Sequence, residues 1–251
     1  MAEPAEATEP VESRALSLPS IVLVTGTTTG VGKTVATAAL AGMLLARGSR
    51  VAVYKPAQTG VGPDEPGDVD EVCRLLASPV NLTVREGIRL RDPLAPSAAA
   101  RRESVPIPSI ADHARTVVEL AGDHHIVLVE GAGGLLVELD ARGGTLADLG
   151  RVLRYQGRSC GAVLVAAAGL GTLNHTALTA EALRTRELPL LGVVVGAWPV
   201  APAEPDLAMT ENLLDLPRIA GAPLLGILPD GSGALDPPTF ARGIPEWLSV
   251  R

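Results

Sequence analysis

One stretch near the amino terminus, residues 21–40, places the strongest constraint on the fold. It reads IVLVTGTTTGVGKTVATAAL: an apolar, β-branched run, then glycines and threonines, then Gly-Lys-Thr and an alanine-rich segment with helical spacing. This order predicts a buried strand, a tight loop and a helix. A strand that leads through such a loop into a helix is typical of α/β folds.

The loop has the features of a phosphate-binding loop. The first N–H groups of a helix lack intrahelical partners and lie at the positive end of the helix dipole, which favours an anion. Lys33 can add a cation between the phosphates, and the Thr34 hydroxyl can reach a magnesium ion. The loop is a variant, because the usual first glycine would fall on Thr27 and stands instead at Gly26. The predicted nucleotide-contacting residues of this segment are Gly30, Val31, Gly32, Lys33, Thr34 and Val35.

Composition favours a single α/β domain. Of the 251 residues, 47% are hydrophobic and only 2% aromatic, so Val, Leu, Ile and Ala must build the core, as in parallel sheets covered by helices. We predict a P-loop NTPase-type α/β fold, with a mostly parallel sheet flanked by helices on both faces, over residues 21–251. Residues 1–20, rich in Ala, Glu and Pro, are predicted to be a disordered extension.

Charge and segment patterns exclude several classes of protein. The formal net charge is −7 and there is no dense basic run, so nucleic acid is not the expected partner. Cys73 and Cys160 show neither metal-ligand spacing nor a disulfide framework. No apolar run is long enough to cross a bilayer and no secretory signal is evident, so we expect a cytoplasmic protein without a membrane partner.

Two later apolar runs lead to charged residues. Residues 50–56 contain Lys55 at the predicted strand end, and residues 125–129 lead to Glu130 and a row of glycines. Ligands gather at the carboxyl ends of parallel strands, so we predict a site role for Lys55 and a direct or water-mediated magnesium contact for Glu130. The acids that open a predicted helix at 68–76 either cap that helix or face the metal, and both interpretations stay open.

A second glycine-flanked helix start follows the predicted strand at 161–167. It spans residues 169–179, and its free N–H groups, with Asn174 and neighbouring threonines, can hold a carboxylate or another anion. His175 has no evident carboxylate partner in the sequence, so we interpret it as structural.

Five segments together closely resemble dethiobiotin synthetases: residues 26–34, 54–60, 129–135, 171–176 and 224–229. The resemblance covers about residues 21–229. It implies an ATP-dependent cyclo-ligase that makes the ureido ring of dethiobiotin from 7,8-diaminononanoate, CO2 and ATP with Mg²⁺, in the penultimate step of biotin biosynthesis. It also implies a homodimer with the active site at the subunit interface, and makes residues 21–251 a single synthetase domain.

The resemblance also implies a role for each matching residue. Lys33, Lys55 and Thr29 are the expected catalytic residues, with Lys33 on the phosphates and Lys55 near the transferred phosphoryl group and the carbamate. The expected metal-side residues are Thr34, Asp68 and Glu130, with Asp70 as the alternative acid. The expected substrate-binding residues are Thr29, Lys55, Thr59, Gly131, Gly171, Thr172, Leu173 and Asn174.

The chain departs from the family pattern where the base of the nucleotide is read. Family members commonly carry Asn just after the apolar strand that is predicted at residues 190–199, whereas this chain has Gly-Ala-Trp-Pro at residues 196–199. Without that paired donor and acceptor, selectivity for ATP should weaken, so that CTP or another triphosphate can serve. Base contacts are then expected mainly from the backbone around Gly196 and Pro229.

Two alternatives share the phosphate-binding loop. A partition- or division-type P-loop ATPase switch usually has an extra lysine early in the loop, and residues 26–32 contain none. A corrinoid amidotransferase synthetase domain is normally joined to a glutamine-hydrolysing domain, for which this chain is too short. The switch ATPase remains the main alternative.

Overall fold

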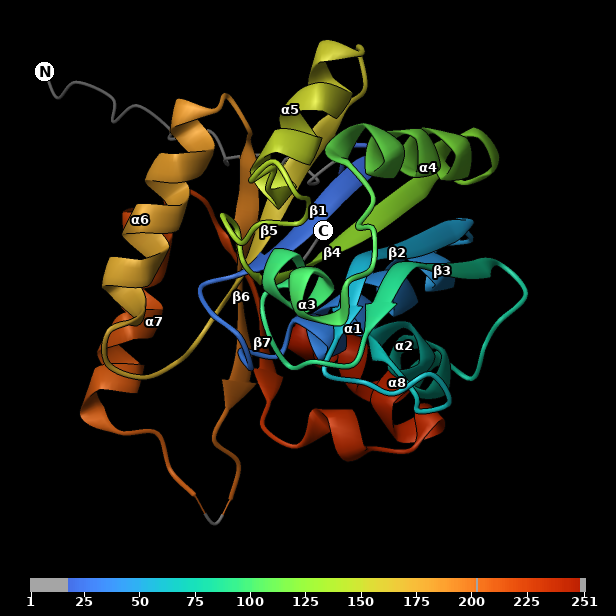
Figure 1. The fold of residues 1–251 in the computed structure, drawn as a ribbon. Helices are drawn as coiled ribbons and strands as arrows, with labels where there is room; N and C mark the ends of the chain where they lie inside the picture. Colours follow the sequence, from blue (N-terminus) through green and yellow to red (C-terminus); the bar gives the residue numbers. More distant parts are fainter. Residues whose placement is uncertain (1–17, 202, 249–251) are drawn as a thin grey trace, which may run out of the picture.

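The computed structural model describes residues 18–201 and 203–248, in which seven strands form one parallel sheet (Figure 1). The sheet order is β3-β2-β4-β1-β5-β6-β7, and every neighbouring pair is parallel. The strands are β1 (Ile21–Gly26), β2 (Val51–Thr59), β3 (Leu82–Leu90), β4 (Ile126–Gly134), β5 (Cys160–Ala166), β6 (Leu190–Trp198) and β7 (Leu224–Pro229). The predicted α/β sheet is confirmed.

Helices cover both faces of the sheet. Their bounds are α1 (Lys33–Ala46), α2 (Asp68–Leu76), α3 (Pro96–Glu103), α4 (Ile110–Asp123), α5 (Leu146–Tyr155), α6 (Thr172–Thr185), α7 (Leu207–Ala220) and α8 (Pro237–Trp247), with a short 3₁₀ turn at Ser232–Ala234. One face packs against α1, α2 and α8, and the other against α4, α5, α6 and α7. Helix α3 lies beside β2 and β3 at one edge.

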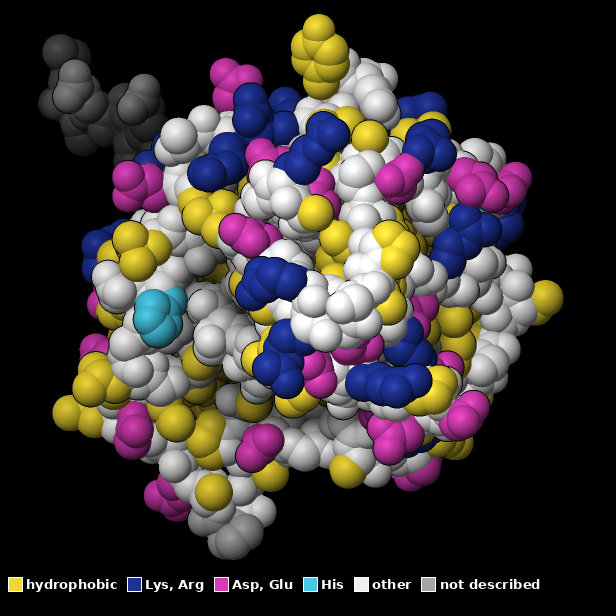
Figure 2. Space-filling model, viewed as in Figure 1, with side chains coloured by type: hydrophobic (Ala, Val, Ile, Leu, Met, Phe, Trp, Pro, Cys, Tyr) yellow, Lys and Arg dark blue, Asp and Glu magenta, His cyan; other side chains and the backbone are white. Residues whose placement is uncertain are grey.

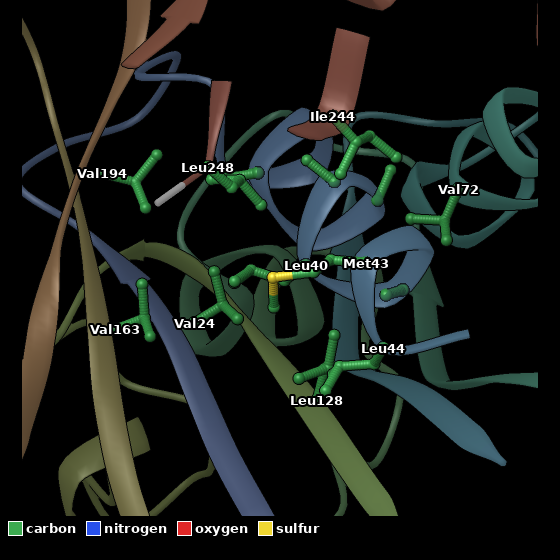
Figure 3. Close-up of a cluster of buried hydrophobic side chains, with 14 of the residues drawn as sticks. Val24, Leu40, Met43, Leu44, Val72, Leu128, Val163, Val194, Ile244 and Leu248 are labelled. Atoms are coloured by element: carbon green, nitrogen blue, oxygen red, sulfur yellow. The ribbon is translucent and has the colours of Figure 1, made fainter. Parts of the chain in front are cut away.

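The core on the α1 face holds the phosphate-binding helix in place. Figure 3 shows Leu40 and Leu44 of α1 near Val24 and Leu128 of the strands, with Ile244 of α8 on the far side of the helix. These side chains are buried, and each contributes about 1.5–3 kcal/mol relative to an exposed position. Because α1 is packed on two sides, its amino-terminal end has a defined position above the sheet.

Two elements are absent from the sequence-based prediction. Strand β3 lies at the edge of the sheet, and its residues alternate between half-buried and exposed, with charged side chains among them. Helix α8 begins at Pro237 with a cap from Asp236, yet contains Gly243 and Pro245, which obscure a helical pattern. Both elements depend on tertiary packing more than on local sequence.

The predicted end of the second strand was wrong. Strand β2 continues to Thr59, three residues beyond the end of the predicted strand at 50–56. It pairs with β4 only as far as Tyr54 and Val129, and beyond that point it pairs with β3 alone. The two strands therefore separate directly before Lys55 and Glu130.

The predicted amino-terminal extension and the predicted cytoplasmic location are not tested by the structure. The predicted disordered extension lies outside the described residues as far as residue 17, and the cytoplasmic location stays a prediction. In the described part of the chain, none of the helices is both long and apolar enough to span a bilayer.

A buried histidine makes stability depend on pH. His113 of α4 is fully buried, and its Nδ1 lies 2.7 Å from the hydroxyl of Tyr54. Burial lowers the pKa of His113, against the opposing effect of Asp112 and Asp140. As pH falls through the ordinary histidine range, His113 therefore binds a proton in the unfolded chain but stays neutral in the folded protein.

We expect the protein to lose stability as pH falls from 7 to 5, with this group contributing at most about 1.4 kcal/mol per pH unit, the limit for one proton. The variant His113→Gln keeps a polar partner for Tyr54 and does not titrate. Its melting temperature, measured by calorimetry at each pH, should fall less steeply than that of the wild type. Parallel curves for the two proteins would contradict this assignment.

Candidate active site

The phosphate-binding loop has a conformation that requires glycine at two positions. Gly30 and Gly32 have φ angles of 75° and 88°, in the left-handed region that side chains disfavour. Gly32 is the N-cap of α1, and no side chain caps the helix there. The first N–H groups of α1 thus remain available for a phosphate.

Strand β6 lies directly against this loop. A Cβ atom on Gly32 would lie 2.5 Å from the carbonyl oxygen of Gly196, and a Cβ atom on Gly196 would lie 1.8 Å from the carbonyl oxygen of Val31. Only glycine permits this approach of two backbones. Gly196 therefore supports the loop from the adjacent strand end, and Val31 of the loop is buried.

Lys55 is the centre of a buried ionic cluster. Its Nζ lies 2.8 Å from Oε1 of Glu130 and 2.5 Å from Oδ2 of Asp68, and it donates to the carbonyl oxygen of Gly131 at 3.1 Å. The Thr34 hydroxyl donates to the same Glu130 oxygen at 2.9 Å. Burial alone would lower the pKa of Lys55, but Glu130 and Asp68 outweigh it and raise the pKa, so the lysine is charged.

Lys33 lies in the same site but has a different environment. Its Nζ donates to the carbonyl oxygen of Thr28 at 3.2 Å. Burial, and then the neighbouring charge of Lys55, lower the pKa of Lys33. The chain contains only two lysines, and both lie here. A polyanion is the ligand class that would best satisfy two adjacent ammonium groups.

The oxygen atoms around Lys55 fit a nucleotide-bound magnesium ion. Thr34 and Glu130 contact each other, and Asp68 reaches the same lysine, so one hydroxyl and two carboxylates surround one position. Among the described residues, no group of three or more His, Cys, Asp or Glu side chains could hold a metal alone. Mg²⁺ beside a nucleotide typically takes one or two carboxylates together with phosphate oxygens and water.

A cavity of about 780 Å³ opens over this cluster. Ten of the predicted site residues line it: Thr29, Gly30, Gly32, Lys33, Thr34, Val35, Lys55, Thr59, Asp68 and Glu130. The apolar wall of the cavity, formed by residues 93–96 and Val137, was not predicted from the sequence. The cavity thus combines a charged floor with an apolar side.

Other predicted residues lie outside the cavity lining. Gly131 is behind Lys55, and Pro229 ends β7, where it pairs with Trp198. Residues 171–174 begin α6 after β5, with Gly171 as N-cap at a φ of 96°. Two buried hydroxyls of α6, on Thr172 and Thr176, have no hydrogen-bond partner within the described residues.

Sequence reasoning missed two polar residues beside the start of α2, and one of them binds Asp68 directly. The Oε1 atom of Gln58 accepts a hydrogen bond from the Asp68 N–H at 2.8 Å. Arg89 of β3 is paired with Glu86 and donates to the carbonyl oxygen of Gly62 at 3.0 Å. A prediction of β3 from its alternating pattern would have revealed Arg89 as a neighbour of β2.

The structure also shows different positions for Asp68 and Asp70, the two acids between which the sequence could not decide. Asp68 lies against Lys55, whereas an Asp70 oxygen accepts from the Gly67 N–H at 2.7 Å and faces Arg89. Asp70 therefore caps α2, and Asp68 is the acid that faces the cavity.

Sequence comparisons show which family the chain belongs to. A family profile described as an AAA domain matches residues 21–237. An ATP-dependent dethiobiotin synthetase BioD of Streptomyces avermitilis is 52% identical over 232 residues, which is 92% of this chain and 93% of the relative. The chain belongs to the dethiobiotin synthetase family. A BioD of Saccharopolyspora erythraea is 55% identical over 221 residues, 88% of this chain and 92% of that protein.

Membership of the dethiobiotin synthetase family confirms the expectation of an ATP-dependent ligase of biotin biosynthesis. Solved structures resemble the chain more distantly. The cell division ATPase MinD of Pyrococcus furiosus has a TM-score of 0.51 at 20% identity, covering 91% of this chain and 88% of that one. Chloroplast FtsY of Physcomitrella patens has a TM-score of 0.52 at 17% identity, covering 91% of this chain and 66% of that one. These likenesses show the fold alone.

Proposed function

We propose that this member of the family forms dethiobiotin from 7,8-diaminononanoate, CO2 and a nucleoside triphosphate, releasing the diphosphate and phosphate. The observation that carries the proposal is the convergence of Lys33, Lys55, Asp68 and Glu130 at one cavity above a phosphate-binding loop. One substrate amine captures CO2 as a carbamate, whose oxygen attacks the γ-phosphorus. The second amine then closes the ring on the activated carbonyl and expels phosphate.

The side chains act by position and charge, without a protein nucleophile. Lys33 and the N–H groups of α1 hold the phosphates, and Lys55 neutralises charge on the carbamate and the transferred phosphoryl group. Thr29 and Thr59 line the cavity where their hydroxyls can orient the diamine. The backbone at Gly131 fixes Lys55 through its carbonyl oxygen. Orientation of three substrates is the main catalytic demand of such a reaction.

We assign Thr34, Asp68 and Glu130 to a magnesium ion that enters with the nucleotide. When bound, the ion would supply positive charge to the phosphates of the nucleotide. Glu130 is held by both Thr34 and Lys55, so its carboxylate is oriented before any ligand arrives.

The proposed working unit is a homodimer with the active site at the subunit interface. Leu170, Leu178, Leu207 and Leu214 are 91%, 57%, 79% and 75% exposed. Figure 2 shows hydrophobic side chains on the left of the view, where Figure 1 has α6 and α7. An apolar surface of this kind is typical of an interface between subunits. It would bring residues 171–174 of one subunit to the carboxylate of a substrate bound in the other.

Purified protein with 7,8-diaminononanoate, bicarbonate and Mg²⁺ is expected to form dethiobiotin with ATP, CTP, GTP and UTP. Their kcat/KM values should lie within about tenfold of one another, because no base-reading Asn follows β6. The carbonyl oxygen of Trp198 accepts from the Asp230 N–H at 2.7 Å, so the ends of β6 and β7 lie side by side. Mass spectrometry of the product and phosphate release provide the measurement.

Two results of that assay would change these conclusions. A kcat/KM for ATP that exceeds the value for every other triphosphate by a factor on the order of 10⁴ would contradict relaxed selectivity. It would mean that a further group in the protein hydrogen-bonds specifically to adenine. Phosphate release without dethiobiotin would contradict the proposed reaction.

A further inference from the structure

Asn212 of α7 is a buried amide to which the proposed chemistry assigns no role. Only 5% of its surface is exposed. Its Nδ2 donates to the carbonyl oxygen of Ala168 at 2.8 Å and to that of Gly169 at 3.1 Å. Both hydrogens of the amide nitrogen are therefore directed to the loop between β5 and α6. A buried side chain that binds two main-chain oxygens of another segment stabilises one conformation of that segment.

This loop leads directly into the first turn of α6. The carbonyl oxygen of Gly169 also accepts from the Thr172 N–H at 3.3 Å, so one oxygen is shared between α7 and the start of α6. Gly171 then caps the helix at a φ of 96°. The direction of the unpaired N–H groups at the helix start follows from the conformation of residues 168–171.

We propose that Asn212 is a positioning residue for the substrate carboxylate. It holds the loop so that the N–H groups of Gly171, Leu173 and Asn174 converge on the carboxylate of a diamine bound in the neighbouring subunit. This inference rests on the proposed function and extends it to a residue on a different helix. Asn212 does not touch the substrate, because it is buried and its donors are occupied.

The variant Asn212→Leu tests the proposal, because it keeps the approximate volume of the side chain and removes both donors. Its KM for 7,8-diaminononanoate should rise on the order of tenfold, since a small displacement of a binding group has a large effect. The kcat and the KM for nucleotide should stay within about twofold. The KM for the methyl ester of the diamine should not change, because the ester lacks the negative charge that a helix start favours.

Leu216→Ala is a matched control. Leu216 is buried one turn further along α7, in the apolar cluster that also contains Ala168 and Leu173, so Leu216→Ala loosens the packing around the loop without removing the Asn212 hydrogen bonds. This variant should lower the melting temperature while leaving the acid-to-ester ratio of KM values at the wild-type level. Asn212→Ser, which retains one donor on a shorter side chain, should give an intermediate acid-to-ester ratio of KM values. It provides the test if Asn212→Leu does not fold.

An equal rise in KM for acid and ester in the Asn212 variants would overturn the positioning role. A changed acid-to-ester ratio of KM values in Leu216→Ala would overturn it too, because loosening of α7 alone would then be enough to change that ratio. Failure of the proposed function can be distinguished from failure of the Asn212 proposal, since in that case the wild-type protein itself would form no dethiobiotin.

Discussion

Replacing Lys55 by methionine is expected to lower dethiobiotin formation by about 10²- to 10³-fold. Lys55 is the cation closest to both carboxylates of the site, and methionine retains its shape without its charge. The variant should also be less stable without ligands, because it leaves Glu130 buried and unpaired with a cation, at a cost of about 3–5 kcal/mol. Steady-state kinetics and thermal unfolding measure the two effects separately.

The double variant Lys55→Met with Glu130→Gln distinguishes the loss of the catalytic charge from the loss of stability. It removes the unpaired carboxylate, so the melting temperature should recover, whereas turnover should not. Arg50→Met removes an exposed cation just before the same strand and should leave activity unchanged. Near-normal turnover in the single Lys55 variant would refute its assigned role.

Gly196→Ala is expected to weaken nucleotide binding by a factor on the order of ten or more, because the P-loop and the end of β6 can no longer keep their positions against each other. The added Cβ would lie 1.8 Å from the carbonyl oxygen of Val31, so either that loop or the end of β6 is displaced. Overpacking of this kind typically costs about 1–3 kcal/mol of stability. Calorimetric titration with ATP and Mg²⁺ gives the affinity.

Gly122→Ala is the corresponding control. Gly122 lies in α4, and nothing would lie within 4 Å of an added Cβ. Because alanine favours the helix, this change should stabilise the protein by up to about 1 kcal/mol and leave nucleotide affinity unaltered. An unchanged affinity in Gly196→Ala as well would show that the loop does not depend on β6.

Local patterns predicted much of the fold. Helix α2 begins and ends at the predicted residues, and β7 lies within the predicted strand at 223–229, because an acidic helix start and a short apolar run between prolines are local signals. Strand β3 was not predicted, since an edge strand with charged side chains lacks a continuous apolar face. With β3 missing, its residue Arg89 could not be placed next to the site.

The sequence by itself determined the family, the phosphate-binding loop and the two lysines, because these reside in contiguous motifs whose chemistry depends on residue type and order. Only the tertiary structure decided that Asp68 faces Lys55 while Asp70 caps α2, and that Asn212 holds the loop before α6. These facts depend on where β2 separates from β4 and on contacts between segments far apart in the chain. No local pattern encodes such contacts, since they arise only when distant segments pack together.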